Sequence, residues 1–145
     1  MSTVYLGLGT NLGDKEANMH DAVRLISGRI GKVVSLSAFY VTEPWGFSSE
    51  NSFLNAACKV ETNFTPFEVL KETQAIEREL GRIHKSVNGN YSDRPMDIDI
   101  LLYDNLILNT PELTIPHPLM MQRPFVMDPL TETAPEVVHT LQGKS

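Results

Sequence analysis

The fold prediction starts from the stretch Met96-Asp97-Ile98-Asp99-Ile100-Leu101-Leu102. Apolar residues at every second position, from Met96 to Leu102, predict a β-strand with one apolar face. Neighbouring side chains of a strand point to opposite faces, so Asp97 and Asp99 share the other face, roughly 7 Å apart along the backbone. The strand therefore presents two carboxylates on the side away from its hydrophobic core.

Three more strands are predicted from the same alternation. Their apolar sides comprise Val4, Leu6 and Leu8, then Val34, Leu36, Ala38 and Tyr40, then Leu54, Ala56, Cys58 and Val60. Phe53, Asn55 and Ala57 are expected on the opposite face of the last of these strands. In the first strand that face carries only Gly7 and Gly9 beside Tyr5, and we expect a flat ligand to approach the backbone there.

Two amphipathic helices are predicted between the strands. The first follows the N-cap residue Asp14, and Gly28 is expected to end or fray it before Ile30. The second begins in the capping box of residues 65–68, with proline at its first position, and Gly81 is expected just after its last turn. Residues 83–95 are polar and aperiodic, which predicts a loop.

The order of these elements is strand, helix, strand, strand, helix, strand. This is the β-α-β-β-α-β order of ferredoxin-like folds, in which two helices cover one face of an antiparallel sheet. We therefore predict an α+β fold and a single domain over residues 1–145. A proline-rich C-terminal extension is expected to wrap the sheet in short pieces, because it contains Pro111, Pro116, Pro118, Pro124, Pro129 and Pro135.

The composition excludes several classes of protein. With 41% hydrophobic and 21% charged residues, the 145-residue chain is typical of a globular domain. Cys58 is the only cysteine, which excludes a disulfide framework and multi-cysteine metal sites and fits a reducing compartment. The net charge of −6 argues against nucleic-acid binding. No apolar run approaches the ~20 residues that span a bilayer, and no secretory leader is recognised, so we expect a cytoplasmic protein with no membrane partner.

Asp97 and Asp99 are the candidate metal ligands. For an isolated Asp-x-Asp pattern, the alternative is simply a charged solvent face on an edge strand. Two carboxylates on one rigid strand nevertheless suit Mg²⁺, which completes its octahedron with water and phosphate oxygens. Arg82, Lys85 and Arg94 precede them in the sequence and are expected to supply positive charge for phosphoryl groups.

Other residues suggest a ligand site without nucleophilic catalysis. Phe53 beside Asn55 suits stacking on and hydrogen bonding to a heterocycle, whereas most other aromatic residues are expected in the core. For His117, held between two prolines, a structural and a functional role are equally open. The glycine-rich turn at residues 7–13 lacks the spacing of a dinucleotide or Walker phosphate motif. Cys58 is expected to be buried, and no nucleophile with an adjacent base is recognised.

Four segments, residues 5–14, 53–56, 94–100 and 115–118, carry a combination of motifs that is more specific than any one of them. The most specific is R-x-x-D-[IL]-D-[IL], which begins at Arg94, and it is joined by Pro116-His117-Pro118. In this order the segments resemble the 6-hydroxymethyl-7,8-dihydropterin pyrophosphokinase family, from about residue 3 to residue 135. The family differs near residues 84–91, where many members carry more arginines.

The resemblance implies a reaction and its cofactor. An intact diphosphoryl group is transferred from ATP to the hydroxymethyl group of 6-hydroxymethyl-7,8-dihydropterin, giving AMP and the pterin diphosphate of folate synthesis, with two Mg²⁺ ions. A non-catalytic pterin-binding domain and a regulatory nucleotide-binding module are the alternatives. The presence of both Asp97 and Asp99 favours catalysis over either alternative. We also expect a monomer.

The resemblance also assigns roles to individual residues. Together with Gly9 from the strand pattern, the expected pterin-binding residues are Thr42, Pro44, Trp45, Phe53, Asn55 and Phe125. The expected ATP-binding residues are Gln74, Glu77, Arg82, Arg94, Ile98, Thr114, His117 and Arg123. The expected catalytic residues are Arg82, Arg94, Asp97 and Asp99, of which the two aspartates also bind the metal.

Overall fold

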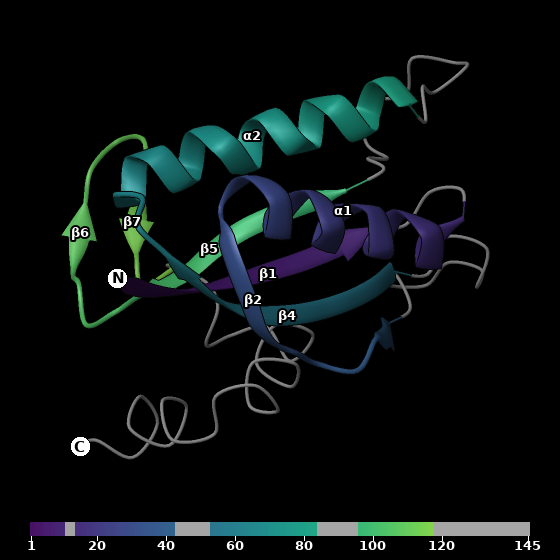
Figure 1. Cartoon of the computed structure of the whole chain (residues 1–145), viewed down its shortest axis with the longest axis horizontal. Helices are drawn as coiled ribbons and strands as arrows, with labels where there is room; N and C mark the ends of the chain where they lie inside the picture. Colours follow the sequence, from purple (N-terminus) through teal and green to yellow (C-terminus); the bar gives the residue numbers. More distant parts are fainter. Residues whose placement is uncertain (11–13, 43–52, 84–95, 118–145) are drawn as a thin grey trace.

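Strand β1 (Ser2–Thr10) lies between two antiparallel neighbours, β4 (Phe53–Thr62) and β5 (Asp97–Tyr103) (Figure 1). Strands β2 (Gly31–Leu36) and β3 (Tyr40–Thr42) both pair with the other edge of β4, which gives a five-stranded sheet in the order β2-β4-β1-β5 with β3 beside β4. This computed structural model describes residues 1–10, 14–42, 53–83 and 96–117.

Helices α1 (Lys15–Arg29) and α2 (Pro66–Ile83) cover one face of the sheet (Figure 1). Both predicted helix starts are confirmed. The Asp14 side chain accepts a hydrogen bond from the Ala17 backbone N–H at 3.1 Å. In the capping box, the Thr65 N–H donates to Glu68 Oε1 at 2.8 Å and the Glu68 N–H donates to Thr65 Oγ1 at 3.2 Å. These bonds satisfy amides that have no partner within the helix.

The first helix ends at Arg29, before Ile30, as predicted, but the predicted end of the second helix is wrong, because Gly81 lies inside it. Gly28 is within α1, which continues to Arg29, and Gly81 is within α2, which continues to Ile83. A Cβ at Gly28 would meet nothing within 4 Å. An exposed helical glycine costs only about 1 kcal/mol relative to alanine, so packing along the rest of α1 can carry the helix through it.

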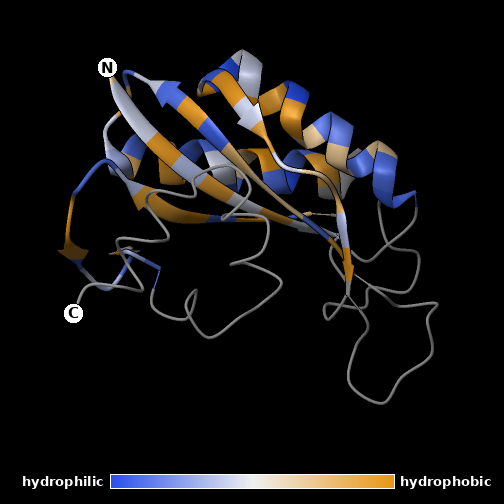
Figure 2. Ribbon diagram, turned by 90° about the horizontal axis from the view of Figure 1, so that it is seen from below, coloured by the Kyte–Doolittle hydropathy of each residue, from blue (hydrophilic) through white to orange (hydrophobic). Residues whose placement is uncertain are grey.

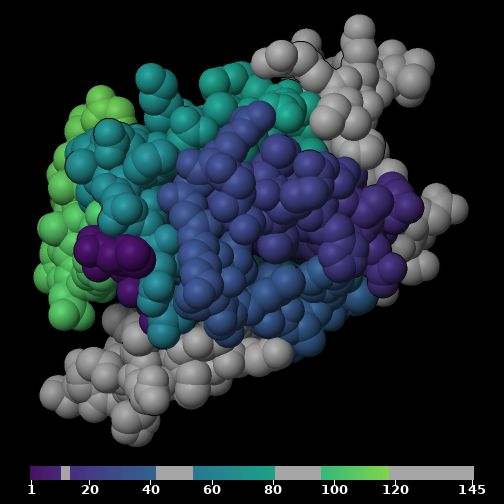
Figure 3. All heavy atoms as spheres, viewed as in Figure 1, coloured from purple at the N-terminus to yellow at the C-terminus, as the bar shows by residue number. Residues whose placement is uncertain are grey.

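The main core lies between the helices and the facing side of the sheet. Its buried residues include Val4, Leu6, Leu8, Met19, Ala22, Ile26, Ala56, Cys58, Val60, Val69, Ile76, Leu80, Met96, Ile98 and Ile100. Hydrophobic and hydrophilic bands alternate along the strands, as the periodicity predicts (Figure 2). The helices also contact each other, through an ion pair between Arg29 and Glu79, and they lie side by side in the space-filling view (Figure 3).

A β-bulge in β5 changes which residues face this core. Tyr5 pairs with Leu102 but Leu6 pairs with Ile100, so Leu101 is the extra residue. Leu102 therefore shares the face of Tyr5, away from the helices, and its predicted helix-facing position is wrong. Tyr103 takes that side instead: it packs against the main core, and its hydroxyl donates a hydrogen bond to the Phe64 carbonyl.

The predicted second strand is divided into β2 and β3. A register irregularity lies at Val34, and the Val34 and Leu36 side chains are 39% and 38% exposed, so they do not form the predicted buried side. Between the two strands, Ser37 continues the pairing with β4: its N–H donates to the Ala57 carbonyl at 2.9 Å, and its hydroxyl accepts from the Ala57 N–H at 3.0 Å. The strand is interrupted without loss of its connection to the sheet.

The chain after β5 forms a short hairpin, β6 (Leu108–Asn109) with β7 (Thr114–Ile115). Strand β7 lies against β5, and the His117 N–H donates to the Leu101 carbonyl at 3.0 Å. The predicted α+β class is confirmed. None of the helices in the described part of the chain has the length and apolar character needed to cross a membrane.

Gly31 provides a test of how closely the start of β2 approaches β4. A Cβ there would lie 2.0 Å from the Glu61 carbonyl oxygen, so the Gly31→Ala variant must displace backbone. We expect it to lose about 1–3 kcal/mol of unfolding free energy, measured by urea denaturation. The matched control is Gly28→Ala, which has free space around it and should gain about 0.5–1 kcal/mol. Equal stabilities of the two variants would contradict this packing.

Candidate active site

Three of the predicted site residues lie in one row across the sheet. Gly9 of β1 pairs with Asn55 of β4 on one side and with Asp97 of β5 on the other. In the next row, Gly7 pairs with Asp99. Paired residues point to the same face, and these positions alternate with the core residues, so all of them lie on the face opposite the helices. The strand register thus brings Asn55, Gly9 and the two aspartates together on one face, as strand parity predicts.

Gly9 and Asn55 approach each other closely. Asn55 is buried, and its Oδ1 would lie 3.1 Å from a Cβ placed on Gly9. A side chain at residue 9 would therefore displace the Asn55 amide, whereas glycine leaves room for it. The amide offers a donor and an acceptor to a ligand over this part of the sheet.

The face is less open at Gly7 than the sequence suggests. A Cβ on Gly7 would meet the Leu101 side chain at 3.4 Å, so Leu101, the bulged residue of β5, lies over this glycine. The prediction of a bare backbone is therefore wrong at Gly7, where a side chain of β5 occupies the space. The run of three apolar residues, Ile100-Leu101-Leu102, interrupts strict alternation and is the sequence signal for the bulge.

Asp97 and Asp99 are half-buried, so their carboxylates remain accessible to water and ligands. Ile98 between them is 6% exposed and belongs to the main core, which fixes the face on which both aspartates lie. Two accessible carboxylates on one strand are a donor set suited to Mg²⁺. Within the described residues no cluster of three or more His, Cys, Asp or Glu could hold a metal, so water and phosphate oxygens would have to supply the other ligands, as is usual for Mg²⁺.

Helix α2 reaches the outer edge of β5 between the two aspartates. The Ile98 N–H donates to Glu77 Oε2 at 2.7 Å. Strand β5 is at the edge of the sheet, so this amide has no neighbouring strand to bond, and the carboxylate takes that place. Gln74 lies about one helical turn before Glu77 and is exposed. Glu77 and Ile98, two of the predicted ATP-binding residues, therefore contact each other directly.

The other end of β5 is joined by the segment that follows β7. His117 donates its backbone N–H to Leu101, two residues beyond Asp99, and its side chain is half-buried. Thr114 lies in β7, where it pairs with Asn109, and it is also half-buried. Both residues therefore lie near β5 rather than near Asn55.

The remaining predicted site residues are not described in full. Thr42 and Phe53 form a backbone pair between β3 and β4, and Arg82 is in the last turn of α2, but the side chains of these three lie outside the described part. Pro44, Trp45, Arg94, Arg123 and Phe125 lie outside the described residues, as do Lys85 and the rest of the predicted loop after residue 83.

Sequence reasoning misplaces one residue of this face. The alternation pattern places Tyr40 on the apolar side of the second strand, but in β3 it pairs with Asn55 and so lies on the site face.

Cys58 is fully buried, as predicted, and burial raises the pKa of its thiol to about 12, although a backbone hydrogen bond to Leu6 acts in the opposite direction. A protonated, inaccessible thiol cannot serve as a nucleophile.

A family model described as 7,8-dihydro-6-hydroxymethylpterin-pyrophosphokinase (HPPK) matches residues 5–135. The chain belongs to the HPPK family. The match includes the whole row from Asn55 to Asp97 and extends through the hairpin after β5.

Individual relatives agree with this assignment to the HPPK family. The chain is 50% identical over 136 residues to a 2-amino-4-hydroxy-6-hydroxymethyldihydropteridine pyrophosphokinase of Porphyromonas gingivalis, covering 93% of this chain and 92% of the relative. A relative with the same name from Aquifex aeolicus is 35% identical over 144 residues, with 99% and 88% covered.

Solved structures support the HPPK fold. A crystal structure of Plasmodium falciparum HPPK-DHPS with pteroate superposes with a TM-score of 0.72 at 16% identity, over 93% of this chain and 39% of that chain. The present chain thus corresponds to about two fifths of that larger protein.

Glu77 gives a test of how the aspartate-bearing strand is held. The Glu77→Ala variant leaves the Ile98 N–H without its carboxylate acceptor, and we expect a loss of about 1–3 kcal/mol in unfolding free energy together with faster hydrogen exchange of the Ile98 amide. Glu77→Gln retains an acceptor and should lose less. Arg78→Ala, at the exposed neighbouring position, is the control. An unchanged exchange rate of the Ile98 amide in Glu77→Ala would rule out this role.

Proposed function

We propose that this chain transfers diphosphate from ATP to the hydroxymethyl group of 6-hydroxymethyl-7,8-dihydropterin, giving AMP and the pterin diphosphate, in folate biosynthesis. The observation that carries the proposal is the row from Asn55 through Gly9 to Asp97, which combines an amide, a glycine and a carboxylate on one face. The HPPK family match and the names of the relatives from P. gingivalis and A. aeolicus support the same activity.

The pterin is assigned to the Asn55 and Gly9 end of the row. A buried amide can recognise the polar edge of a heterocycle by hydrogen bonds, and it rejects ligands that leave it unsatisfied. Gly9 allows the flat ring to approach the sheet. In the family resemblance, Phe53 and Phe125 stack on the two ring faces, and Thr42, Pro44 and Trp45 complete the pocket.

The nucleotide is assigned to β5 and its outer edge. Gln74, Glu77, Ile98, Thr114 and His117 are proposed to contact ATP, with Arg82, Arg94 and Arg123 directed at its phosphates. Asp97 and Asp99 are proposed to hold two Mg²⁺ ions, which, when bound, neutralise charge on the phosphate oxygens. The half-buried setting of the two aspartates supports this assignment, because it leaves both of them accessible.

The products define the bond that changes. The hydroxymethyl oxygen attacks the β-phosphorus of ATP, forming an oxygen–phosphorus bond, and its proton is released to solvent. The bond from the β-phosphorus to the oxygen that bridges the α- and β-phosphates breaks, and AMP leaves with that electron pair. The protein contributes mainly alignment and electrostatic stabilisation, since such a transfer requires little covalent chemistry from side chains.

We also infer that the fold is ferredoxin-like, with a proline-rich C-terminal extension. The strand order β2-β4-β1-β5, in which both helices connect strands that are not neighbours, supports the inference. A single domain over residues 1–145, a monomeric state and a cytoplasmic location stay predictions from the sequence.

The reaction is tested by its nucleotide product. Incubation of the protein with ATP, Mg²⁺ and 6-hydroxymethyl-7,8-dihydropterin should produce AMP and pterin diphosphate in equal amounts, because both come from one cleavage between the α- and β-phosphates. Separation of the nucleotides by anion-exchange chromatography measures this. Omission of the pterin is the control and should leave the ATP intact. ADP as the main product would show a different transferase.

Replacing each aspartate by asparagine tests its role as a metal ligand, because asparagine lacks the negative charge but has nearly the same size and shape. Asp97→Asn and Asp99→Asn should each lower turnover by roughly a thousandfold, since a metal ligand contributes several kcal/mol to transition-state stabilisation. Circular dichroism should show an unchanged fold. Glu112→Gln, which changes an exposed acid after β6, is the charge-matched control and should retain activity. Near-normal turnover of either aspartate variant would refute its assignment as a metal ligand.

A further inference from the structure

Tyr40 extends the row of site residues by one strand. It pairs with Asn55, which pairs with Gly9, which pairs with Asp97, so four adjacent strands contribute one residue each at the same level. Strands in a sheet are spaced about 4.8 Å apart, so this row spans roughly 14 Å from Tyr40 to Asp97. Tyr40 borders Asn55 on the side away from the aspartates.

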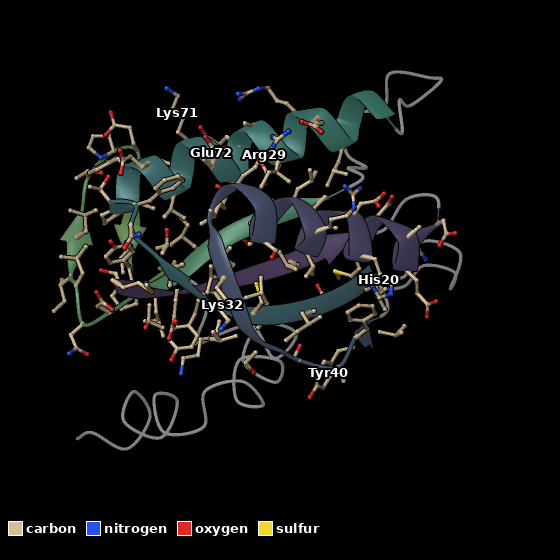
Figure 4. The ribbon with its side chains drawn as sticks, viewed as in Figure 1. His20, Arg29, Lys32, Tyr40, Lys71 and Glu72 are labelled. Carbon is tan, nitrogen blue, oxygen red and sulfur yellow. The ribbon has the colours of Figure 1, made fainter. Side chains whose placement is uncertain are left out.

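The Tyr40 side chain lies on the site face. Phe39, the preceding residue, packs against the main core, and its ring centroid is 5.5 Å from that of His20 on α1. Alternation then directs Tyr40 to the opposite face, and Figure 4 shows its side chain pointing away from the helices. Tyr40 is half-buried and is not part of the main core, whereas the next residue, Val41, is 65% exposed.

The position of Tyr40 is determined by the connection between β2 and β3. Ser37 makes two backbone-directed hydrogen bonds to Ala57, which is two residues from Asn55 on β4. The Ser37 hydroxyl also donates to the Ala38 carbonyl at 2.7 Å, and Ser37 is itself buried. These bonds bring the chain back to β4 in the register that places Tyr40 opposite Asn55.

We propose that Tyr40 is a substrate-positioning residue that acts through Asn55, which rests on the proposed function. Directly paired residues have Cβ atoms about 4.5–5.5 Å apart, so a tyrosine ring is well placed to pack beside the Asn55 amide. The terminal torsion of asparagine has a broad preference, and a neighbouring ring restricts it. Tyr40 thereby keeps the amide directed over Gly9, ready to bind the polar edge of the pterin.

The binding experiment separates the ring of Tyr40 from its hydroxyl group. Calorimetry measures the Kd of 6-hydroxymethyl-7,8-dihydropterin in the presence of Mg²⁺ and α,β-methylene-ATP, and separately the Kd of that ATP analogue. Tyr40→Ala should weaken pterin binding about tenfold or more with the analogue's Kd unchanged, whereas Tyr40→Phe, which retains the ring, should stay within about twofold of the parent protein. Val41→Ala on the same strand is the matched control and should bind both ligands normally.

A double-mutant comparison tests whether Tyr40 acts through Asn55. If it does, Tyr40→Ala combined with Asn55→Ala should bind the pterin no more weakly than Asn55→Ala alone, within about twofold. Multiplied losses in the double variant would overturn the proposal, as would normal binding by Tyr40→Ala or a loss in Tyr40→Phe equal to that in Tyr40→Ala. Thermal unfolding checks each variant, and Tyr40→Leu replaces Tyr40→Ala, with the same expected loss, if the latter does not fold.

The outcome for the parent protein separates this inference from the proposed function. If the unmodified chain does not bind the dihydropterin, the proposed function itself is contradicted. If the unmodified chain binds the dihydropterin and Tyr40→Ala binds it equally well, only the role of Tyr40 is wrong.

Discussion

The pairing of β1 with β4 on one side and β5 on the other is the constraint on which the rest of the structure depends. It brings Asn55 and Asp97, which are far apart in the sequence, to the two sides of Gly9. A slip of one residue would exchange the two faces of a strand and bury the aspartates. The core opposes such a slip, because Ile98 and the alternate residues of β1 and β4 are buried against the helices.

The aspartate-bearing strand is at the edge of the sheet, and its outer backbone groups are bonded by residues from elsewhere in the chain. Glu77 of α2 accepts from the Ile98 amide, and the His117 amide donates to the Leu101 carbonyl. An edge strand with unpaired amides is open to pairing with other chains, and these contacts close part of that edge. They also connect the predicted nucleotide-binding residues to the strand that carries Asp97 and Asp99.

The bulge at Leu101 divides the face opposite the helices into two chemically different parts. At one end, Tyr5, Leu101 and Leu102 are buried apolar residues, and the Leu101 side chain lies over Gly7. At the other end, Asn55 and Asp97 flank Gly9. Gly7 is thus bordered by an apolar side chain and Gly9 by a polar one, the Asn55 amide.

The sequence by itself determined the features that depend on neighbouring residues. Asp14 and the capping box around Thr65 start the two helices, and the alternation around Ile98 places both aspartates on one face, because capping and strand parity are local. The tertiary structure alone decided the rest of the described fold and site: the continuation of α2 through Gly81, the division of β2 from β3, the bulge at Leu101, and the contacts of Glu77 and Tyr40. Each of these results from pairing or packing between segments distant in the chain, whose energies exceed the local preferences that a sequence pattern records.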